Sequence, residues 1–495
     1  MISHFIDDCR RSGIDFSLGS AGKLKINADK SALTAEVVGK VKAAKTDIIA
    51  FLKAEKISQL DRDFQAGVSK RSDILARLKL TEEEIEGFYP LVPLQEGMLL
   101  QHMLNEKNDP YIAYFILKIK DKQVFEKVMD SFRSVVDRHA AYRTAIIWRN
   151  VNQSYQLVKK HVSIPVTYMH CADEGEYEAN LQALKSQERF MDLEQDALIR
   201  IHVLVRDDID EWMLFIERHH IISDQISLGI TLHELLKFYS QEQNELAPVR
   251  HQYEFALQHN AQTGIDTGYF DRLLEDFAAP SLLFDINQTH VDAADSENYS
   301  HMFGADLQHA VRVQARQSGV SPAALFHFAR AIVMAKYCNT KDVLFPTVMT
   351  GRMTVPEYRT TIGMFLNALP FRVKLNDTCV ADQLKAINMQ LLHTFEYEQV
   401  PLNAATQKLS DEFGTVFNCI FNYRHAGEEA VLDELPFEHM LANTESTEPF
   451  RLSVTDTGEA FEASLDAYKG VKGETLLQSL ALALDYIVHE LAEGT

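Results

Sequence analysis

Apolar and polar residues near the N-terminus recur at two different spacings. Apolar residues follow a helical spacing at the start of the chain and again over residues 33–53. Between these segments, two short alternating runs at 14–18 and 23–27 flank a glycine-containing turn at 19–22, which is the pattern of a β-hairpin. The pattern predicts a small α/β unit, followed by a polar and helix-prone connector.

Strand and helix patterns alternate through the rest of the chain. The predicted strands are 115–120, 143–148, 155–158, 198–205, 212–217, 343–349, 370–373 and 416–422. The predicted helices are 124–139, 226–243, 305–317, 322–338, 380–396 and 474–492. A chain of 495 residues is too long for one ordinary core, so we expect two large units. Their mixed order, with hairpins, favours α/β or α+β sandwiches over a Rossmann sheet.

Charge and cysteine content narrow the class of protein. The formal net charge is -22, and such a surface repels nucleic acid and anionic lipid, so we expect neither a nucleic-acid partner nor a membrane. The N-terminus lacks the pattern of a signal peptide, and no apolar run approaches the roughly 20 residues that span a bilayer. The five cysteines are scattered without metal-ligand spacing, which predicts reduced thiols in a cytoplasmic protein.

The segment His219–Asp224 carries the candidate chemistry. It follows a predicted strand and precedes a predicted helix, and such junctions place functional side chains on a rigid base. The two histidines have three interpretations: a metal site, a structural histidine, or a catalytic histidine that exchanges a proton near neutral pH. Adjacent residues of an extended segment point to opposite sides, which disfavours chelation, so no metal is expected. The other two interpretations stay open on these residues alone.

Six short motifs, in order along the chain, resemble those of one family. The pattern His-His-x-x-x-Asp at 219–224 is similar to the signature of the condensation domains of nonribosomal peptide synthetases, within the wider CoA-dependent acyltransferase superfamily. The other matching stretches are 89–99, 138–145, 253–256, 362–372 and 397–402. The resemblance covers about residues 88–490, and six ordered matches make it specific.

The resemblance implies a fold and a set of site residues. The fold is an α/β (α+β) sandwich of two chloramphenicol-acetyltransferase-like lobes in a V, with a tunnel between them. By position in the motif, His220 is the catalytic histidine and His219 its structural neighbour. Asp224 is similar to the aspartate that pairs with an arginine of the second motif, here Arg143.

Two further positions belong to this implied site. Asn367 resembles the asparagine of the fifth motif near the tunnel, and a simple loop hydrogen bond is an equal alternative. Gln225 stands where the family usually has glycine, a residue that permits close backbone approach. The glutamine narrows the tunnel or contributes an amide, and it argues against oxyanion stabilisation by the backbone.

The N-terminal unit resembles the small docking domains of the tubulysin-synthetase type found on downstream synthetase subunits. The matching stretches are 12–16, 22–26 and 45–52. In that class, the C-terminal tail of an upstream subunit adds a strand to the hairpin edge. This implies a docking edge at Lys23, Leu24, Lys25 and Ile26, where the lysines, with Lys30, favour an acidic tail. The alternative is that lysines on an edge strand only block aggregation.

The expected organisation is a docking domain at 1–60, a helical linker at 61–87, an N-lobe at 88–262 and a C-lobe at 263–495. Because the sequence ends with the condensation unit, it resembles the stand-alone terminal condensation subunits of rhabdopeptide/xenortide-like synthetases. That resemblance implies that a free amine attacks a peptidyl thioester on the 4′-phosphopantetheine of an upstream carrier domain, releasing a peptide amide. No cofactor is expected on the chain itself.

Other functions stay open at this point. One is an acyltransferase that uses acyl-CoA without a carrier, against which the docking unit argues. A second is a catalytically silent recruitment domain, against which the intact histidine motif argues, and a third is the related epimerisation branch. Heterocyclisation is disfavoured because that branch replaces the histidine pair with aspartate. The sequence also does not separate a base role of His220 from a positioning role.

Overall fold

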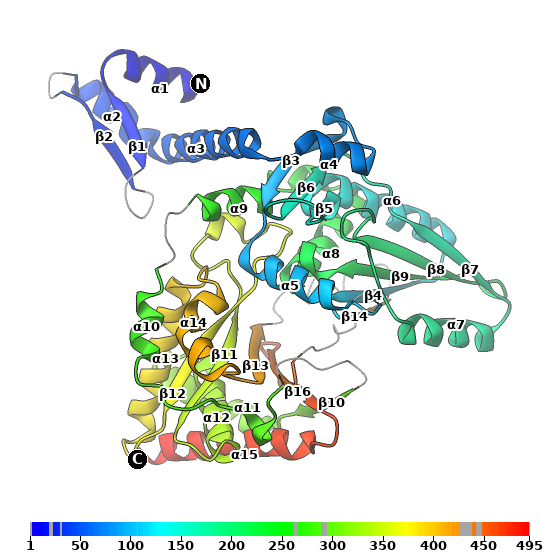
Figure 1. Ribbon diagram of the computed structural model, residues 1–495, viewed down its shortest axis with the longest axis vertical. Helices are drawn as coiled ribbons and strands as arrows, with labels where there is room; N and C mark the ends of the chain where they lie inside the picture. The colour runs from blue at the N-terminus through cyan, green and yellow to red at the C-terminus, as the bar shows by residue number, and fades with distance from the viewer. Residues whose placement is uncertain are drawn as a thin grey trace.

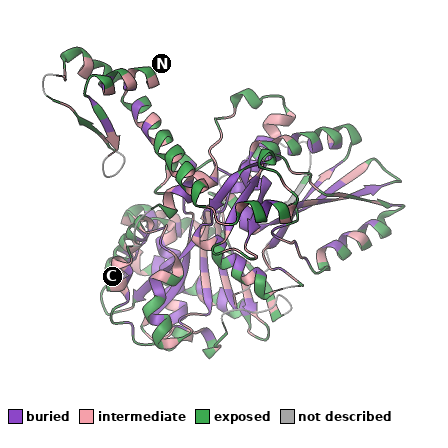
Figure 2. Cartoon of the chain, turned by 45° about the horizontal axis from the view of Figure 1, so that its top comes forward, coloured by how far each residue is buried: buried purple, intermediate pink, exposed green. Residues whose placement is uncertain are grey.

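The computed structural model describes residues 2–18, 23–29, 32–105, 107–261, 266–288, 295–425, 438–441 and 448–494. A small N-terminal unit stands away from two larger α/β bodies, to which one long helix connects it (Figure 1). Buried residues are concentrated on the sheets of the two bodies and on the helices packed against them (Figure 2).

The N-terminal unit is a hairpin packed against helices. β1 (Asp15–Leu18) pairs antiparallel with β2 (Leu24–Asn27), which confirms the predicted hairpin. The small core brings together residues of α1 (Ile2–Arg11), α2 (Ala35–Ala43) and the start of α3 (Lys45–Gly67). The predicted turn at 19–22 and Lys30 lie outside the described residues.

The prediction of a single helix over 33–53 was wrong. The structure has two helices that meet at Ala44, whose backbone is not helical. Val41, Ile48 and Leu52 all enter the same core, at spacings that a straight helix would also produce. The hydrophobic pattern therefore does not mark the break.

Helix α3 ties the N-terminal unit to the first α/β body. Its 23 residues extend over about 34 Å, and the expected boundary between residues 60 and 61 falls inside it. Near its end, the Gln65 amide donates to the backbone carbonyl of Phe88 at 2.6 Å and accepts from the Phe88 backbone N–H at 3.1 Å. Gly87 permits this approach, because a Cβ there would lie 2.7 Å from Gln65 Nε2.

The first α/β body has two sheets. The five-stranded sheet has the order β14 (Glu438–Leu441), β4 (Ile112–Ile119), β9 (Glu211–His219), β8 (Ile199–Arg206) and β7 (Val166–Cys171). The three-stranded sheet has the order β3 (Ile85–Pro90), β6 (Tyr155–Lys159) and β5 (Thr144–Ile147). One face of the larger sheet packs against α6 (Lys122–Arg138) and α8 (Gln225–Tyr239), and the other against α7 (Glu174–Ser186). The predicted hairpins β5–β6 and β8–β9 are confirmed.

The second body is built on one mixed sheet. Its order is β10 (Ser296–Met302), β16 (Phe461–Tyr468), β15 (Phe450–Asp456), β13 (Cys419–His425), β11 (Asp342–Met349) and β12 (Asn367–Lys374). One face packs against α11 (Ala305–Ser318), α12 (Pro322–Tyr337), α13 (Val380–Glu396) and α15 (Gly473–Glu493). The other face packs against α10 (Gly268–Leu274) and α14 (Leu402–Phe413).

Two segments cross between the bodies. Strand β14 follows the second body's β13 in sequence but pairs with β4 of the first. The loop between β11 and β12 also reaches the first body, where Tyr358, Ile362 and Met364 join its core. In the described part of the chain, no single helix is long and apolar enough to span a membrane, although α11 and α12 pass that test as a pair bent by 110°.

Candidate active site

The His219–Asp224 segment is a short turn between β9 and α8. Strand β9 ends at His219, one 3-10 turn covers His220–Ile222, and Asp224 is the N-cap of α8. The Asp224 carboxylate accepts from the backbone N–H and the hydroxyl of Ser227, each at 2.8 Å. An aspartate at this position satisfies free N–H groups of the helix and fixes where it begins. The predicted strand-to-helix junction is confirmed.

His220 is held by its backbone rather than by its ring. Its N–H donates to the carbonyl of Tyr111 at 2.7 Å, and its carbonyl accepts from the Ser223 N–H at 3.1 Å. The ring is half-buried, and its Nδ1 atom is buried without a hydrogen-bond partner among the described residues. Burial, with a smaller effect of the nearby Arg218 cation, lowers the pKa of His220 to about 4. The imidazole is therefore neutral at pH 7 and able to accept a hydrogen bond.

His219 points into the protein. Its Nδ1 accepts from the backbone N–H of Ile221 at 3.0 Å, and its Nε2 lies 2.9 Å from a carboxylate oxygen of Asp109. The same Asp109 oxygen lies 2.6 Å from Nδ1 of His102. Burial alone would raise the pKa of Asp109, but the hydrogen bonds from the two histidines outweigh it and hold the pKa well below its usual range.

The predicted pairing of Asp224 with Arg143 was wrong. Asp224 is bonded to Arg352, which lies in the loop after β11 of the second body. Arg143 instead donates to the carboxylate of Glu86 at 2.6 Å and to the carbonyl of Lys160 at 3.2 Å. Arg143 lies at the edge of the three-stranded sheet, where these groups are its nearest partners, whereas Arg352 enters from the opposite lobe.

The Asp224–Arg352 ion pair links the two lobes at the place where they contact each other. Both side chains are buried, and Arg352 also donates to the carbonyl of Thr361 at 2.9 Å. Burial would raise the pKa of Asp224, but the Arg352 charge and the Ser227 hydrogen bonds hold it below its ordinary value. Beside the pair, the Ser227 hydroxyl lies 2.9 Å from the Gly363 carbonyl oxygen and 3.0 Å from the Gly363 nitrogen. The motif at 219–224 and the motif at 362–372 thus meet where the two lobes contact each other.

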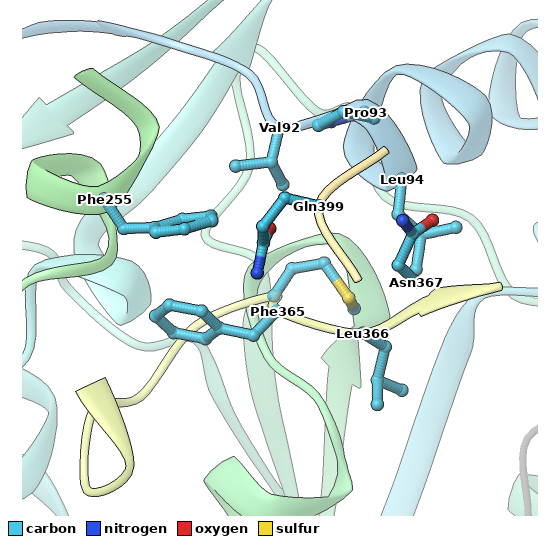
Figure 3. A pocket seen from close by; sticks show the side chains of 9 residues that line it. Val92, Pro93, Leu94, Phe255, Phe365, Leu366, Asn367 and Gln399 are labelled. Atoms are coloured by element: carbon cyan, nitrogen blue, oxygen red, sulfur yellow. The ribbon is translucent and has the colours of Figure 1, made fainter. Parts of the chain in front are cut away.

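Asn367 forms loop hydrogen bonds. Its side-chain amide donates to the carbonyls of Glu398 at 2.9 Å and Val400 at 2.7 Å. It also lines a pocket between the lobes, together with Val92–Leu94 of the first motif, Phe255 and Gln399 (Figure 3). Gln225 is the first residue of α8, and its side chain is exposed.

Three residues of this network were not found from the sequence: His102, Asp109 and Arg352. A signal for Arg352 exists, because it lies shortly after a buried strand and precedes the fifth motif. His102, Asp109 and His219 are also groups that bind metals, with ligand atoms within 4.8 Å of one another. The contacts at 2.6 and 2.9 Å are ordinary hydrogen-bond lengths, and the expectation of no metal ion stays a prediction.

Two α/β lobes that exchange segments, with a histidine-bearing turn at their junction, define a two-lobed transferase fold of the chloramphenicol-acetyltransferase type. Residues 85–489 match the family model for the condensation domain, and residues 2–54 match that of the TubC N-terminal docking domain. The chain therefore belongs to the condensation-domain family of nonribosomal peptide synthetases and carries an N-terminal docking domain. The chemistry of this family is amide-bond formation by acyl transfer from phosphopantetheine-bound substrates.

Curated relatives are much longer proteins. The chain is 30% identical over 426 residues to malpinin synthetase of Mortierella alpina, covering 81% of this chain and 5% of the relative. It is 25% identical over 335 residues to tyrocidine synthase 2 of Brevibacillus parabrevis, covering 65% of this chain and 9% of the relative. The chain thus spans less than a tenth of either relative.

Solved structures agree on the fold. The EpoB cyclization-docking bidomain from Sorangium cellulosum has a TM-score of 0.67 and 16% identity, with 99% of this chain and 98% of that chain covered. The condensation domain of the monacolin K polyketide synthase has a TM-score of 0.67 and 15% identity, with 82% and 98% covered. The predicted two-lobed fold with an N-terminal docking unit is confirmed.

Proposed function

We propose that this chain transfers a peptidyl group from the 4′-phosphopantetheine of an upstream carrier domain to a free amine, and so releases a peptide amide. The observation that carries the proposal is the position of His220. His220 lies on a turn that contacts both lobes. Its own backbone N–H is bonded to Tyr111 of the first lobe, and Asp224, at the end of the segment, is bonded to Arg352 of the second lobe. Donor and acceptor substrates that enter between the lobes would meet beside it.

The reaction needs positioning and the transfer of one proton. The amine nitrogen attacks the thioester carbonyl carbon, the C–N bond forms, and the C–S bond breaks. The phosphopantetheine sulfur leaves with the electron pair and takes up the proton that the amine gives off. A neutral amine and a thioester are already reactive, so the site need not create a nucleophile. Holding the two reactants together can contribute roughly 7–11 kcal/mol.

His220 manages the proton in this scheme. A neutral imidazole accepts a hydrogen bond from the amine as its nitrogen becomes positive, and so stabilises the zwitterionic intermediate. With its pKa lowered to about 4, His220 is a weak base. This favours hydrogen bonding to the developing ammonium over removal of a proton from a free ammonium ion before attack.

Gln225 supports a free amine as the acceptor. The family glycine leaves the start of α8 without a side chain beside the histidine turn. In this chain an exposed glutamine side chain occupies that position. It would obstruct a phosphopantetheine arm more than a small free amine.

In this proposal, the docking unit binds the upstream partner. Lys23, Lys25 and Ile26 are exposed on or beside β2, which pairs with β1 and leaves its other edge open among the described residues. We propose that an acidic C-terminal tail of the upstream subunit adds a strand there. We also propose the division into a docking domain at 1–60, a linker at 61–87, an N-lobe at 88–262 and a C-lobe at 263–495.

The proposal is tested with an upstream carrier loaded with a peptidyl thioester and a panel of free amines, using mass spectrometry to detect released amides. We expect amide formation with free amines and little with an aminoacyl group on a second carrier. The Gln225→Gly variant should gain activity toward the carrier-bound acceptor. Transfer only to the carrier-bound acceptor would overturn the free-amine part, and equal rates from acyl-CoA would favour the carrier-independent acyltransferase.

A further inference from the structure

The segment Asp109–Tyr111 lies directly against the histidine turn. It precedes β4, and the pairing of β4 with β9 places Ile112 opposite His219. Asp109 is 2% exposed, and no solvent competes for its carboxylate. One of its oxygens is bonded to His102 and His219, and the other accepts from the Tyr111 backbone N–H at 2.9 Å.

Hydrogen bonding fixes which nitrogen of His219 carries the proton. The Ile221 N–H points at Nδ1, so Nδ1 is the acceptor and the proton of a neutral ring is on Nε2. That proton faces the Asp109 carboxylate at 2.9 Å. Because the low pKa of Asp109 keeps it ionised, it can only accept, and His102 must also donate. Each partner therefore has one defined hydrogen-bonding role.

Two connections lead from Asp109 to the catalytic turn. The first runs through His219 to the N–H of Ile221. The second runs through Tyr111, whose N–H donates to Asp109 and whose carbonyl accepts from the His220 N–H. These are the first two N–H groups of the 3-10 turn, and such groups have no partner within the turn itself. Asp109 thus organises the N-terminal end of the turn, whereas Asp224 fixes the start of α8, which follows the turn.

We propose that Asp109 is a positioning residue for the transfer reaction and that His102 supports it. The inference rests on the proposed role of His220. Because Nδ1 of His220 has no partner among the described residues, the ring takes its direction from the backbone of the turn. A carboxylate that fixes this backbone at two adjacent N–H groups sets where the imidazole points. Asp109 itself does not touch the reacting atoms.

Asp109→Asn is the first test. An amide has one acceptor oxygen and one NH2 group, so it cannot accept from both histidines and also from the Tyr111 N–H, and one N–H would face another donor. We expect kcat to fall about 100-fold, because displacement of a catalytic group by about 1 Å can have an effect of that size. The KM for the loaded carrier and for the amine should change little. The readouts are single-turnover amide formation and thermal denaturation.

Two variants of His102 provide a second test that does not depend on whether Asp109→Asn folds. His102→Asn keeps an N–H near the place of Nδ1, whereas His102→Leu has nearly the same size and no donor. We expect the leucine variant to lose about ten-fold in kcat, by analogy with the roughly 10- to 100-fold losses seen when an outer hydrogen bond to a metal-binding histidine is removed. The asparagine variant should recover most of that loss. Equal kcat in the two variants would overturn the proposal.

A cycle with His220→Ala separates this inference from the proposed function. If Asp109 acts through His220, Asp109→Asn should cause no further loss in the His220→Ala background. Full additivity, or wild-type kcat in a folded Asp109→Asn protein, would overturn the role of Asp109 and leave that of His220 standing. Wild-type activity of His220→Ala alone would instead overturn the proposed function. If the Asp109→Asn protein does not fold, the comparison of kcat between His102→Asn and His102→Leu tests the role of Asp109.

Discussion

The histidine turn and the β1–β2 hairpin are the two places where this chain is proposed to meet its substrates and partner, and they are built in opposite ways. His219 and Asp224 are fully buried, and their side chains are bonded to residues more than 100 positions away. The hairpin has strands of four residues, and β2 leaves Lys25, Ile26 and Asn27 exposed.

The difference follows from what each region has to do. The turn has to hold one imidazole in one place, so its polar groups are buried and paired, and the loss of one partner leaves another uncompensated. The hairpin has to bind and release a separate chain, so it keeps free backbone groups and screened charges. Changes in the paired residues of the turn should therefore affect stability and kcat, whereas changes in the hairpin should affect affinity and its salt dependence.

Removal of Arg352 should have the largest effect on stability. Arg352→Met leaves the Asp224 carboxylate buried beside Ser227 without its cation, which typically costs about 3–5 kcal/mol in free energy of unfolding. Denaturant unfolding measures the change. The Asp224→Asn/Arg352→Met double variant should recover a substantial part of the loss, because no uncompensated charge remains.

Arg143→Met is the matched control. Arg143 is buried but pairs with Glu86, so its replacement should show no coupling to Asp224→Asn in a double-mutant cycle. Strong coupling between Asp224 and Arg143, with none to Arg352, would contradict the lobe contact described here.

Charge reversal on the hairpin should have an intermediate effect. The double variant Lys23→Glu/Lys25→Glu should weaken binding of an acidic upstream tail by roughly ten-fold at low salt, because two exposed attractions become repulsions. The loss should shrink as salt increases. Isothermal titration calorimetry with a synthetic tail peptide gives the Kd.

Lys42→Glu/Lys45→Glu is the control for the docking edge. It changes the net charge by the same amount at exposed positions on the helices of the same unit. The Kd should change much less in this control. Equal losses in the two proteins would mean that only net charge matters and that β2 is not the docking edge.

The pH dependence of transfer should show the smallest effect. An ordinary histidine is half protonated near pH 6.5, but burial lowers the pKa of His220 to about 4. The functional form is neutral, and protonation would begin only as the pH falls toward that value. With a weakly basic amine that stays neutral, kcat/KM should therefore be flat from about pH 8 to about pH 5. An acid limb with a midpoint near pH 6.5 would contradict the lowered pKa of His220.

Local patterns predicted part of the secondary structure of the two lobes, and left out strands β3, β7, β15 and β16 and helices α7, α10 and α14, among others. Each predicted strand and helix of the two lobes overlaps an observed one, because a buried face leaves a periodic signature in the sequence. Strand β10 was missed because its residues, Ser296–Met302, are mainly polar and none is fully buried. Strand β14 comes from the second half of the chain and pairs with the first lobe, which no local pattern indicates.

The site was predicted only as far as its motif residues. The position of His220 and Asp224 on a strand-to-helix turn is confirmed, whereas the partner of Asp224 was wrong. Asp224 and Arg352 are 128 positions apart, and Asp109 and His219 are 110 apart. Which side chains meet at such separations depends on strand order and on how the lobes contact each other. In a single sequence, a buried aspartate before a strand looks the same as an exposed one.

The most direct test of the central claim is single-turnover amide formation by His220→Ala, with a loaded upstream carrier and a competent amine. We predict a loss of at least about 100-fold relative to the unchanged protein, because proton handling by a positioned side chain contributes at least that much. Thermal stability and binding of the upstream tail should stay the same, since the ring makes no hydrogen bond through Nδ1 and lies far along the chain from the hairpin. A rate within about two-fold of the unchanged protein would contradict the assignment of the histidine turn as the catalytic site.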